Sequence, residues 1–107
     1  MERTQVSKES ILGYLDEIKE EFSEKGIAKI ALFGSFSQER ASVYSDIDIA
    51  IQKDKNFLKN FSPYDYFEII SELKVIIAKK FGKNVDIFDL DSNSPFLKDI
   101  KKELLYV

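Results

Sequence analysis

The chain has 107 residues, of which 44% are hydrophobic, and we expect residues 1–107 to form a single domain with its own core. Its 16 basic and 19 acidic residues give a net charge of −3, which argues against direct nucleic-acid binding, because such binders usually carry a basic excess. The absence of Cys and His excludes disulfides, zinc–thiolate sites and histidine acid–base chemistry. No run approaches the roughly 18 apolar residues of a membrane span, so we expect a cytoplasmic protein with no membrane partner.

The first half of the chain predicts a helix, a strand and a second, shorter helix. Hydrophobic residues recur at helical spacing over Ser7–Lys25, where the first Ser can act as the cap. Gly26 can end this helix in a left-handed conformation. The hydrophobic run Ile27–Phe33 then predicts a buried strand, and a turn leads into a short helix expected over Ser35–Ala41.

The second half predicts two strands and two helices. Alternation over Asp46–Gln52 indicates a strand, and Lys53–Phe61 is a charged connection. Ser-Pro pairs open helices at Ser62–Phe81 and Ser94–Leu104, and Val85–Leu90 between them indicates a third strand. The order α-β-α-β-α-β-α predicts an α/β (α+β) fold, with a small mixed sheet of three strands or slightly more flanked by helices.

Two carboxylates in the second predicted strand point to a metal site. Asp46 and Asp48 are two residues apart, so in a strand they project from the same face. Side by side, unpaired, they repel by about 4 kcal/mol at about 4 Å and an effective dielectric near 20. Mg2+ offsets such repulsion and takes carboxylate and phosphate oxygens together. The turn at Gly34 and Ser35 suits phosphate, because small residues let backbone N–H groups approach its oxygens.

The spacing of these residues resembles that of a known family. Gly34-Ser35, ten residues, then Asp46-x-Asp48 is similar to the nucleotidyltransferases of the DNA polymerase beta superfamily. The short chain resembles their minimal nucleotidyltransferase (MNT) branch, the MntA-type antitoxins paired with HEPN toxins. The resemblance runs from about Ile11 to Tyr106 and implies the nucleotidyltransferase fold. Its specific residues are Gly34, Ser35, Ser45, Asp46, Asp48 and Asp86.

The resemblance implies a set of catalytic metal ligands. Asp46, Asp48 and Asp86 would hold two Mg2+ ions, the arrangement used for in-line phosphoryl displacement. Asp89 and Asp91 are rivals for the third position, and a strand-edge charge is the alternative reading of Asp86.

The resemblance also implies a nucleotide site for ATP. Gly34, Ser35 and Ser45 would contact the nucleotide, with its terminal phosphates at the turn. Members commonly carry Arg-Gly where this chain has Gln38 and Glu39. Arg40, two residues late, is a candidate to replace the missing loop arginine, and a solvated charge is its alternative reading.

The implied function is transfer of AMP from ATP to a hydroxyl, with a tyrosine of a HEPN-type toxin as acceptor and that toxin as partner. The expected core accounts for the whole length of the chain and leaves no residues for a separate acceptor-binding domain. The acceptor is therefore expected on another macromolecule or on a second subunit. Two alternatives remain. One is a catalytically inactive module that blocks its partner by contact, and the other is a small-molecule nucleotidyltransferase acting as a homo-oligomer.

Overall fold

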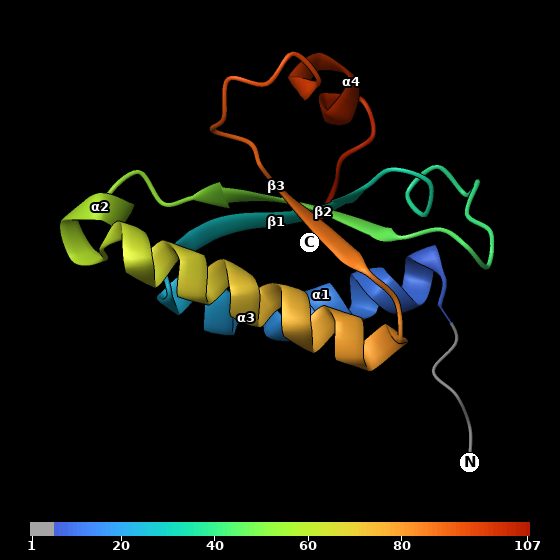
Figure 1. Ribbon diagram of the computed structural model, residues 1–107, viewed down its shortest axis with the longest axis horizontal. Helices are drawn as coiled ribbons and strands as arrows, with labels where there is room; N and C mark the ends of the chain where they lie inside the picture. Colours follow the sequence, from blue (N-terminus) through green and yellow to red (C-terminus); the bar gives the residue numbers. More distant parts are fainter. Residues whose placement is uncertain (1–5) are drawn as a thin grey trace.

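The computed structural model describes residues 6–107, which form helices and strands in one continuous arrangement (Figure 1). The elements in chain order are α1 (Lys8–Glu24), β1 (Ile27–Phe33), β2 (Ile47–Lys53), α2 (Phe57–Asn60), α3 (Pro63–Phe81), β3 (Val85–Asp89), α4 (Leu97–Lys101) and β4 (Leu105–Tyr106). No helix within this range has both the length and the apolar character that a membrane span requires. That residues 1–107 make a single domain stays a prediction.

The two long helices begin at the caps that the sequence predicts. Ser7 and Ser10 form a reciprocal capping box at the start of α1, and Ser62 and Asp65 form another at the start of α3. Each box satisfies backbone N–H groups that have no partner within the helix. Gly82 ends α3 with φ at 65°, a left-handed conformation that favours glycine.

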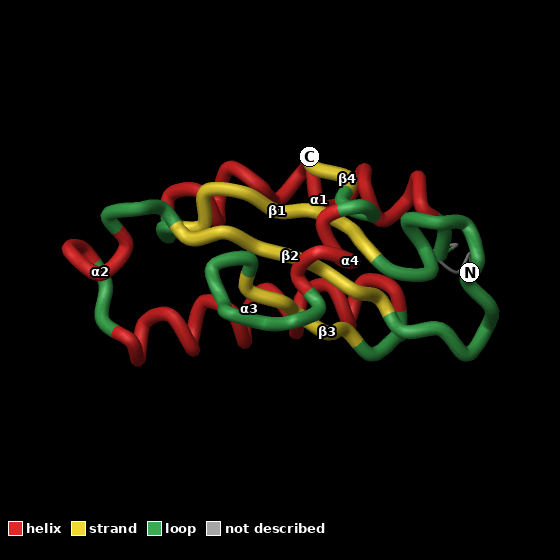
Figure 2. The backbone as a smooth tube through the Cα atoms, turned by 90° about the horizontal axis from the view of Figure 1, so that it is seen from above, coloured by secondary structure: helices red, strands yellow, loops and turns green. Residues whose placement is uncertain are grey.

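The four strands form one mixed sheet in the order β3-β2-β1-β4. Strand β1 is antiparallel to both β2 and β4, whereas β2 and β3 are parallel. Helices α1 and α3 cover one face, and α4 with its flanking loops lies over the other (Figures 1 and 2). This confirms the predicted small mixed sheet flanked by helices.

The core lies between the sheet and helices α1 and α3. Its buried residues include Ile11, Leu15 and Phe22 of α1, Ile30 and Leu32 of β1, Ile47, Ile49 and Ile51 of β2, and Leu73 and Ile77 of α3. Side chains alternate along a strand, so Asp48, between Ile47 and Ile49, projects from the opposite face. Register pairs Asp48 with Phe33 of β1 and with Asp86 of β3. These three residues therefore form one row across the face that α1 and α3 leave uncovered.

The predicted helix over Ser35–Ala41 is wrong, because the structure has turns there. The N–H of Glu39 donates to the carbonyl of Phe36, and the N–H of Arg40 to that of Ser35. Glu39 has a φ of 56°. This pattern is a Schellman ending, which stops a helix after a single turn.

Other parts of the chain also differ from the prediction, and strand β3 ends at Asp89 rather than Leu90. Strand β2 begins at Ile47, so Asp46 lies one residue before it. The connection Lys53–Phe61 contains the short helix α2. The helix predicted over Ser94–Leu104 spans only α4, because the chain leaves it to form β4 against β1. Strand β4 has two residues, so its formation depends on pairing with β1 rather than on a local sequence pattern.

Candidate active site

Three carboxylates gather where β2 and β3 begin. Asp48 is half-buried, while Asp46 and Asp86 are exposed. None of the three forms an ion pair or a side-chain hydrogen bond with any residue between 6 and 107. Burial, followed by the charges of Asp86, Asp46 and Glu103, raises the pKa of Asp48 to about 6. Among the described residues, these three carboxylates therefore concentrate negative charge with no ion pair to offset it.

The turn after β1 lies directly against Asp48. Gly34 has a φ of 78°, and a Cβ at this position would overlap the Asp48 carboxylate. Only glycine therefore serves here, both for the backbone conformation and for the close approach. The buried Ser37 hydroxyl donates to the Gly34 carbonyl over 3.0 Å and holds the turn. Ser35 follows Gly34 and is half-buried.

A fourth carboxylate, Glu103, reaches the same place from the C-terminal segment. The Gly34 N–H donates to Glu103 Oε1 over 3.1 Å. Arg40 Nη2 lies 3.5 Å from Glu103 Oε2, and its side chain is 68% exposed. Sequence reasoning misses Glu103 because it lies 69 residues from Gly34 and no local pattern connects the two.

The loop before Asp46 is held by its own polar groups. The Ser45 hydroxyl accepts the Ser42 backbone N–H at 2.9 Å. Lys83 Nζ donates to the carbonyls of Val43 and Ser45, at 3.0 Å each. Asp46 lines a small polar hollow of about 390 Å³ beside Lys83. These contacts fix the approach of the chain to Asp46 and use the Ser45 oxygen within the loop.

Asp89, one rival for the third position, has its own partners. It accepts from Lys53 Nζ at 2.5 Å and from the Tyr66 hydroxyl at 2.6 Å, and it caps the Asp91 N–H at 2.8 Å. Burial opposes ionisation of Asp89, but these hydrogen bonds hold its pKa below the ordinary value. Asp91 lies 3.6 Å from the same lysine. The structure thus brings Asp86, rather than Asp89 or Asp91, beside Asp48.

The carboxylate oxygens suit a hard cation such as Mg2+. Within residues 6–107 no group of three or more Asp, Glu, Cys or His side chains is arranged to hold a metal ion. However, Asp46, Asp48 and Asp86 have no ion pair or side-chain hydrogen bond within the described residues, and glycine at position 34 lets the turn approach the Asp48 carboxylate closely. The donor set therefore fits the metal that the resemblance implies.

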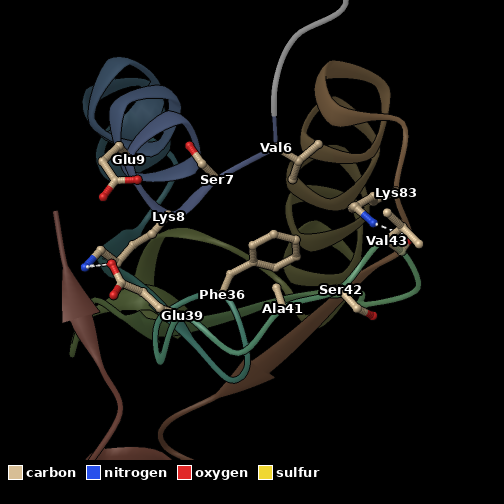
Figure 3. Close-up of a pocket in the computed structure, with 10 residues that line it drawn as sticks. All are labelled: Val6, Ser7, Lys8, Glu9, Phe36, Glu39, Ala41, Ser42, Val43 and Lys83. Atoms are coloured by element: carbon tan, nitrogen blue, oxygen red, sulfur yellow. Dashed lines mark hydrogen bonds and ion pairs between the residues drawn. The ribbon is translucent and has the colours of Figure 1, made fainter.

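A cavity of about 630 Å³ lies elsewhere, between the start of α1 and the turns after β1. Figure 3 shows Phe36 facing this cavity and the Lys8–Glu39 ion pair at its rim. The pair is 2.8 Å long, and Lys8 holds the pKa of Glu39 below its usual range. Glu39 is therefore occupied on the α1 side of the turn, and the cavity contains none of the three site aspartates.

The fold agrees with comparisons to known proteins. The family model "Polymerase beta, Nucleotidyltransferase" matches residues 16–106. The chain is 36% identical over 83 residues to "Putative protein adenylyltransferase MJ1379" of Methanocaldococcus jannaschii, covering 76% of this chain and 77% of the relative. It is 33% identical over 97 residues to "Putative protein adenylyltransferase MJ1217" of the same organism, covering 84% and 83%. The chain belongs to the polymerase beta nucleotidyltransferase family.

Comparison with solved structures indicates which type of nucleotidyltransferase domain this chain has. A structure described as "Structure of putative minimal nucleotidyltransferase" superposes with a TM-score of 0.68 at 17% identity, covering 95% of this chain and 97% of that one, and shows the shared fold. A toxin–antitoxin structure with AMP-PNP superposes with a TM-score of 0.58 at 26% identity, covering 85% and 69%. The protein is therefore a nucleotidyltransferase with an MNT-type domain.

Proposed function

We propose that this protein transfers AMP from ATP to a tyrosine hydroxyl of a HEPN-type toxin. The observation that carries the proposal is the cluster of Asp46, Asp48 and Asp86, which has no cationic partner among residues 6–107 and in which Asp48 lies against the Gly34 turn. Support also comes from relatives named as protein adenylyltransferases and from the AMP-PNP-bound toxin–antitoxin structure.

In this proposal the three carboxylates would hold two Mg2+ ions, and the Gly34–Ser35 turn, Ser45 and Arg40 would bind the triphosphate. Mg2+ held there would supply positive charge that offsets the phosphate charge. Asp48 is half-buried beside the turn, which suits a ligand that stays fixed. Asp86 is exposed, so an incoming acceptor can reach it.

The transfer step makes one bond and breaks one. The acceptor oxygen attacks the α-phosphorus of ATP and forms a new P–O bond. The bond from that phosphorus to the oxygen bridging the α- and β-phosphates breaks, and pyrophosphate leaves. Asp86 accepts the hydroxyl proton. Catalysis on this view is mostly positioning and charge stabilisation.

A second candidate is a module that blocks its partner by contact without chemistry. One observation favours it: the Gly34 N–H, a candidate phosphate donor, is occupied by the Glu103 carboxylate. Both candidates involve a protein partner, so the test must separate chemistry from contact.

The test co-expresses a HEPN-type toxin with wild-type protein, with Asp46→Asn/Asp48→Asn, and with Asp16→Asn as a matched exposed control. Intact-mass and peptide mass spectrometry of the toxin then look for an added AMP residue and its position. We expect the adduct on a tyrosine with wild type and with the control, and none with the double variant. Neutralisation by the double variant without an adduct would replace transfer by contact inhibition.

A further inference from the structure

The amide that would receive a phosphate already holds an acidic side chain of this chain. Glu103 Oε1 accepts the Gly34 N–H at 3.1 Å, and Glu103 Oε2 lies 3.5 Å from Arg40. A carboxylate and a phosphate offer such donors the same kind of anionic oxygen. Glu103 therefore occupies two donors that a triphosphate needs.

The fold fixes Glu103 in this position. Strand β4 pairs antiparallel with β1, with Leu105 opposite Leu32. Continuing that register by two residues sets Glu103 opposite Gly34. The Glu103 N–H also donates to the Ile100 carbonyl of α4 over 2.9 Å. The side chain is 28% exposed, so the contact is partly shielded from water.

The charge around Glu103 makes the contact easy to exchange. Asp48 lies close enough for its charge and that of Glu103 to oppose each other. Arg40, its single cationic partner among the described residues, is 68% exposed, which makes the ion pair weak. The Glu103 carboxylate thus lies near other negative charges, and its main stabilising contact is the hydrogen bond from the Gly34 N–H.

We infer that Glu103 is a residue that sets nucleotide affinity: it competes with the triphosphate for the Gly34 amide and Arg40, and bound nucleotide displaces it. This inference rests on the proposed function, because it requires ATP to bind at the Gly34 turn. Displacement hands both donors to phosphate oxygens and moves the Glu103 side chain away from Asp48.

The test is calorimetry of ATP binding, with Mg2+ and with EDTA, to wild type, Glu103→Gln and Glu68→Gln. Glutamine keeps an acceptor for the Gly34 N–H, but the neutral contact is weaker and Arg40 is released. We expect Glu103→Gln to tighten ATP binding by about fivefold to tenfold in both conditions. Glu68→Gln removes the same charge from the exposed side of α3 and should leave the affinity unchanged.

Amide NMR spectra of the ATP-free proteins supply a second readout, since Glu103→Gln should shift the Gly34 resonance whereas Glu68→Gln should not. Absence of ATP binding to the wild type would overturn the proposed function and this inference with it. Wild-type binding that Glu103→Gln leaves unchanged, or weakens as loss of a metal ligand would, overturns the inference alone. An unmoved Gly34 resonance does the same.

Discussion

Carboxylates lie at both ends of the parallel pair formed by β2 and β3, Asp48 and Asp86 near the start and Asp89 at the end, and the two ends differ in how the charge is balanced. Where both strands end, Asp89 lies between Lys53 and Tyr66 and its pKa is lowered. Where both strands begin, Asp48 forms no ion pair with any residue that the structure describes, and its pKa is raised to about 6. Both carboxylates are half-buried. Burial is therefore common to the two carboxylates, and their pKa values differ because Asp89 has a cation and hydrogen-bond donors beside it, whereas Asp48 has other carboxylates nearby.

The largest expected effect is on AMP-transfer activity, which should depend on Asp48 and not on Asp89. Asp48→Asn should lower the rate of AMP transfer by at least about 100-fold, because a neutral amide is a poor Mg2+ ligand beside the phosphates. Asp89→Asn should leave the rate per folded molecule unchanged. The measurement is the initial rate of AMP incorporation into the toxin partner. Equal losses in the two variants would erase the functional distinction between the ends.

The next effect is on stability at the balanced end. Asp89→Asn should lower the free energy of unfolding by about 2 kcal/mol, because Lys53 and Tyr66 lose a charged acceptor in a partly buried site. Urea denaturation measures this change. Asp91→Asn is the control, since Asp91 is more exposed and 3.6 Å from Lys53, and its loss should be smaller. A larger loss of stability in Asp91→Asn than in Asp89→Asn would show that Asp91, and not Asp89, is the main partner of Lys53.

Where β2 and β3 begin, replacing aspartate by asparagine should change the free energy of unfolding in the opposite direction. Asp48→Asn should raise the unfolding free energy of the metal-free protein by about 1 kcal/mol near pH 7, after discounting the shift for solvent exposure. The folded pKa is about 6 against 3.8 for the ordinary group, so ionisation opposes folding. The penalty is full above about pH 6 and absent below about pH 4.

Urea titrations of wild type and Asp48→Asn in EDTA at both ends of that window check the sign. The difference between the two proteins cancels the titration of other carboxylates. A variant that is less stable than wild type at high pH would mean that Asp48 has a stabilising partner in the folded protein.

The smallest effect concerns Glu39, a carboxylate balanced by Lys8 at the surface. Its φ of 56° disfavours a side chain, and the ion pair to Lys8 is exposed. Glu39→Gly should therefore raise the unfolding free energy by about 0.5 kcal/mol, as the relief of strain exceeds the lost pair and the added chain entropy. Glu39→Gln keeps the strain, and thermal unfolding should show it slightly less stable than wild type.

Elements bounded by strong local signals could be predicted from the sequence. Strand β1 lies between Gly26 and Gly34, and the sequence predicts its bounds, Ile27–Phe33, as observed. Helix α3 begins at the Ser62 cap and ends at Gly82. In each case the chemistry that starts or stops the element lies within the element or next to it.

Features that depend on distant contacts could not be predicted. Strand β4 has two residues and exists through its pairing with β1. The turn at Glu39 ends what reads as a helix, because a non-glycine residue takes a left-handed conformation there. At the site, the spacing of Asp46 and Asp48 was visible in the sequence, but the contact of Glu103 with Gly34 joins segments 69 residues apart.

The central claim is that Asp46, Asp48 and Asp86 form a binding site for a metal–nucleotide complex. Its most direct test is the melting temperature of the protein with ATP, measured in Mg2+ and in EDTA. Nucleotide at about 100 times its Kd adds about 2.7 kcal/mol, which corresponds to a rise of roughly ten degrees or more in a domain of this size. We predict this rise with Mg2+ for wild type and Asp89→Asn, and none for Asp48→Asn. An equal rise in EDTA, or a full rise in Asp48→Asn, would contradict the claim.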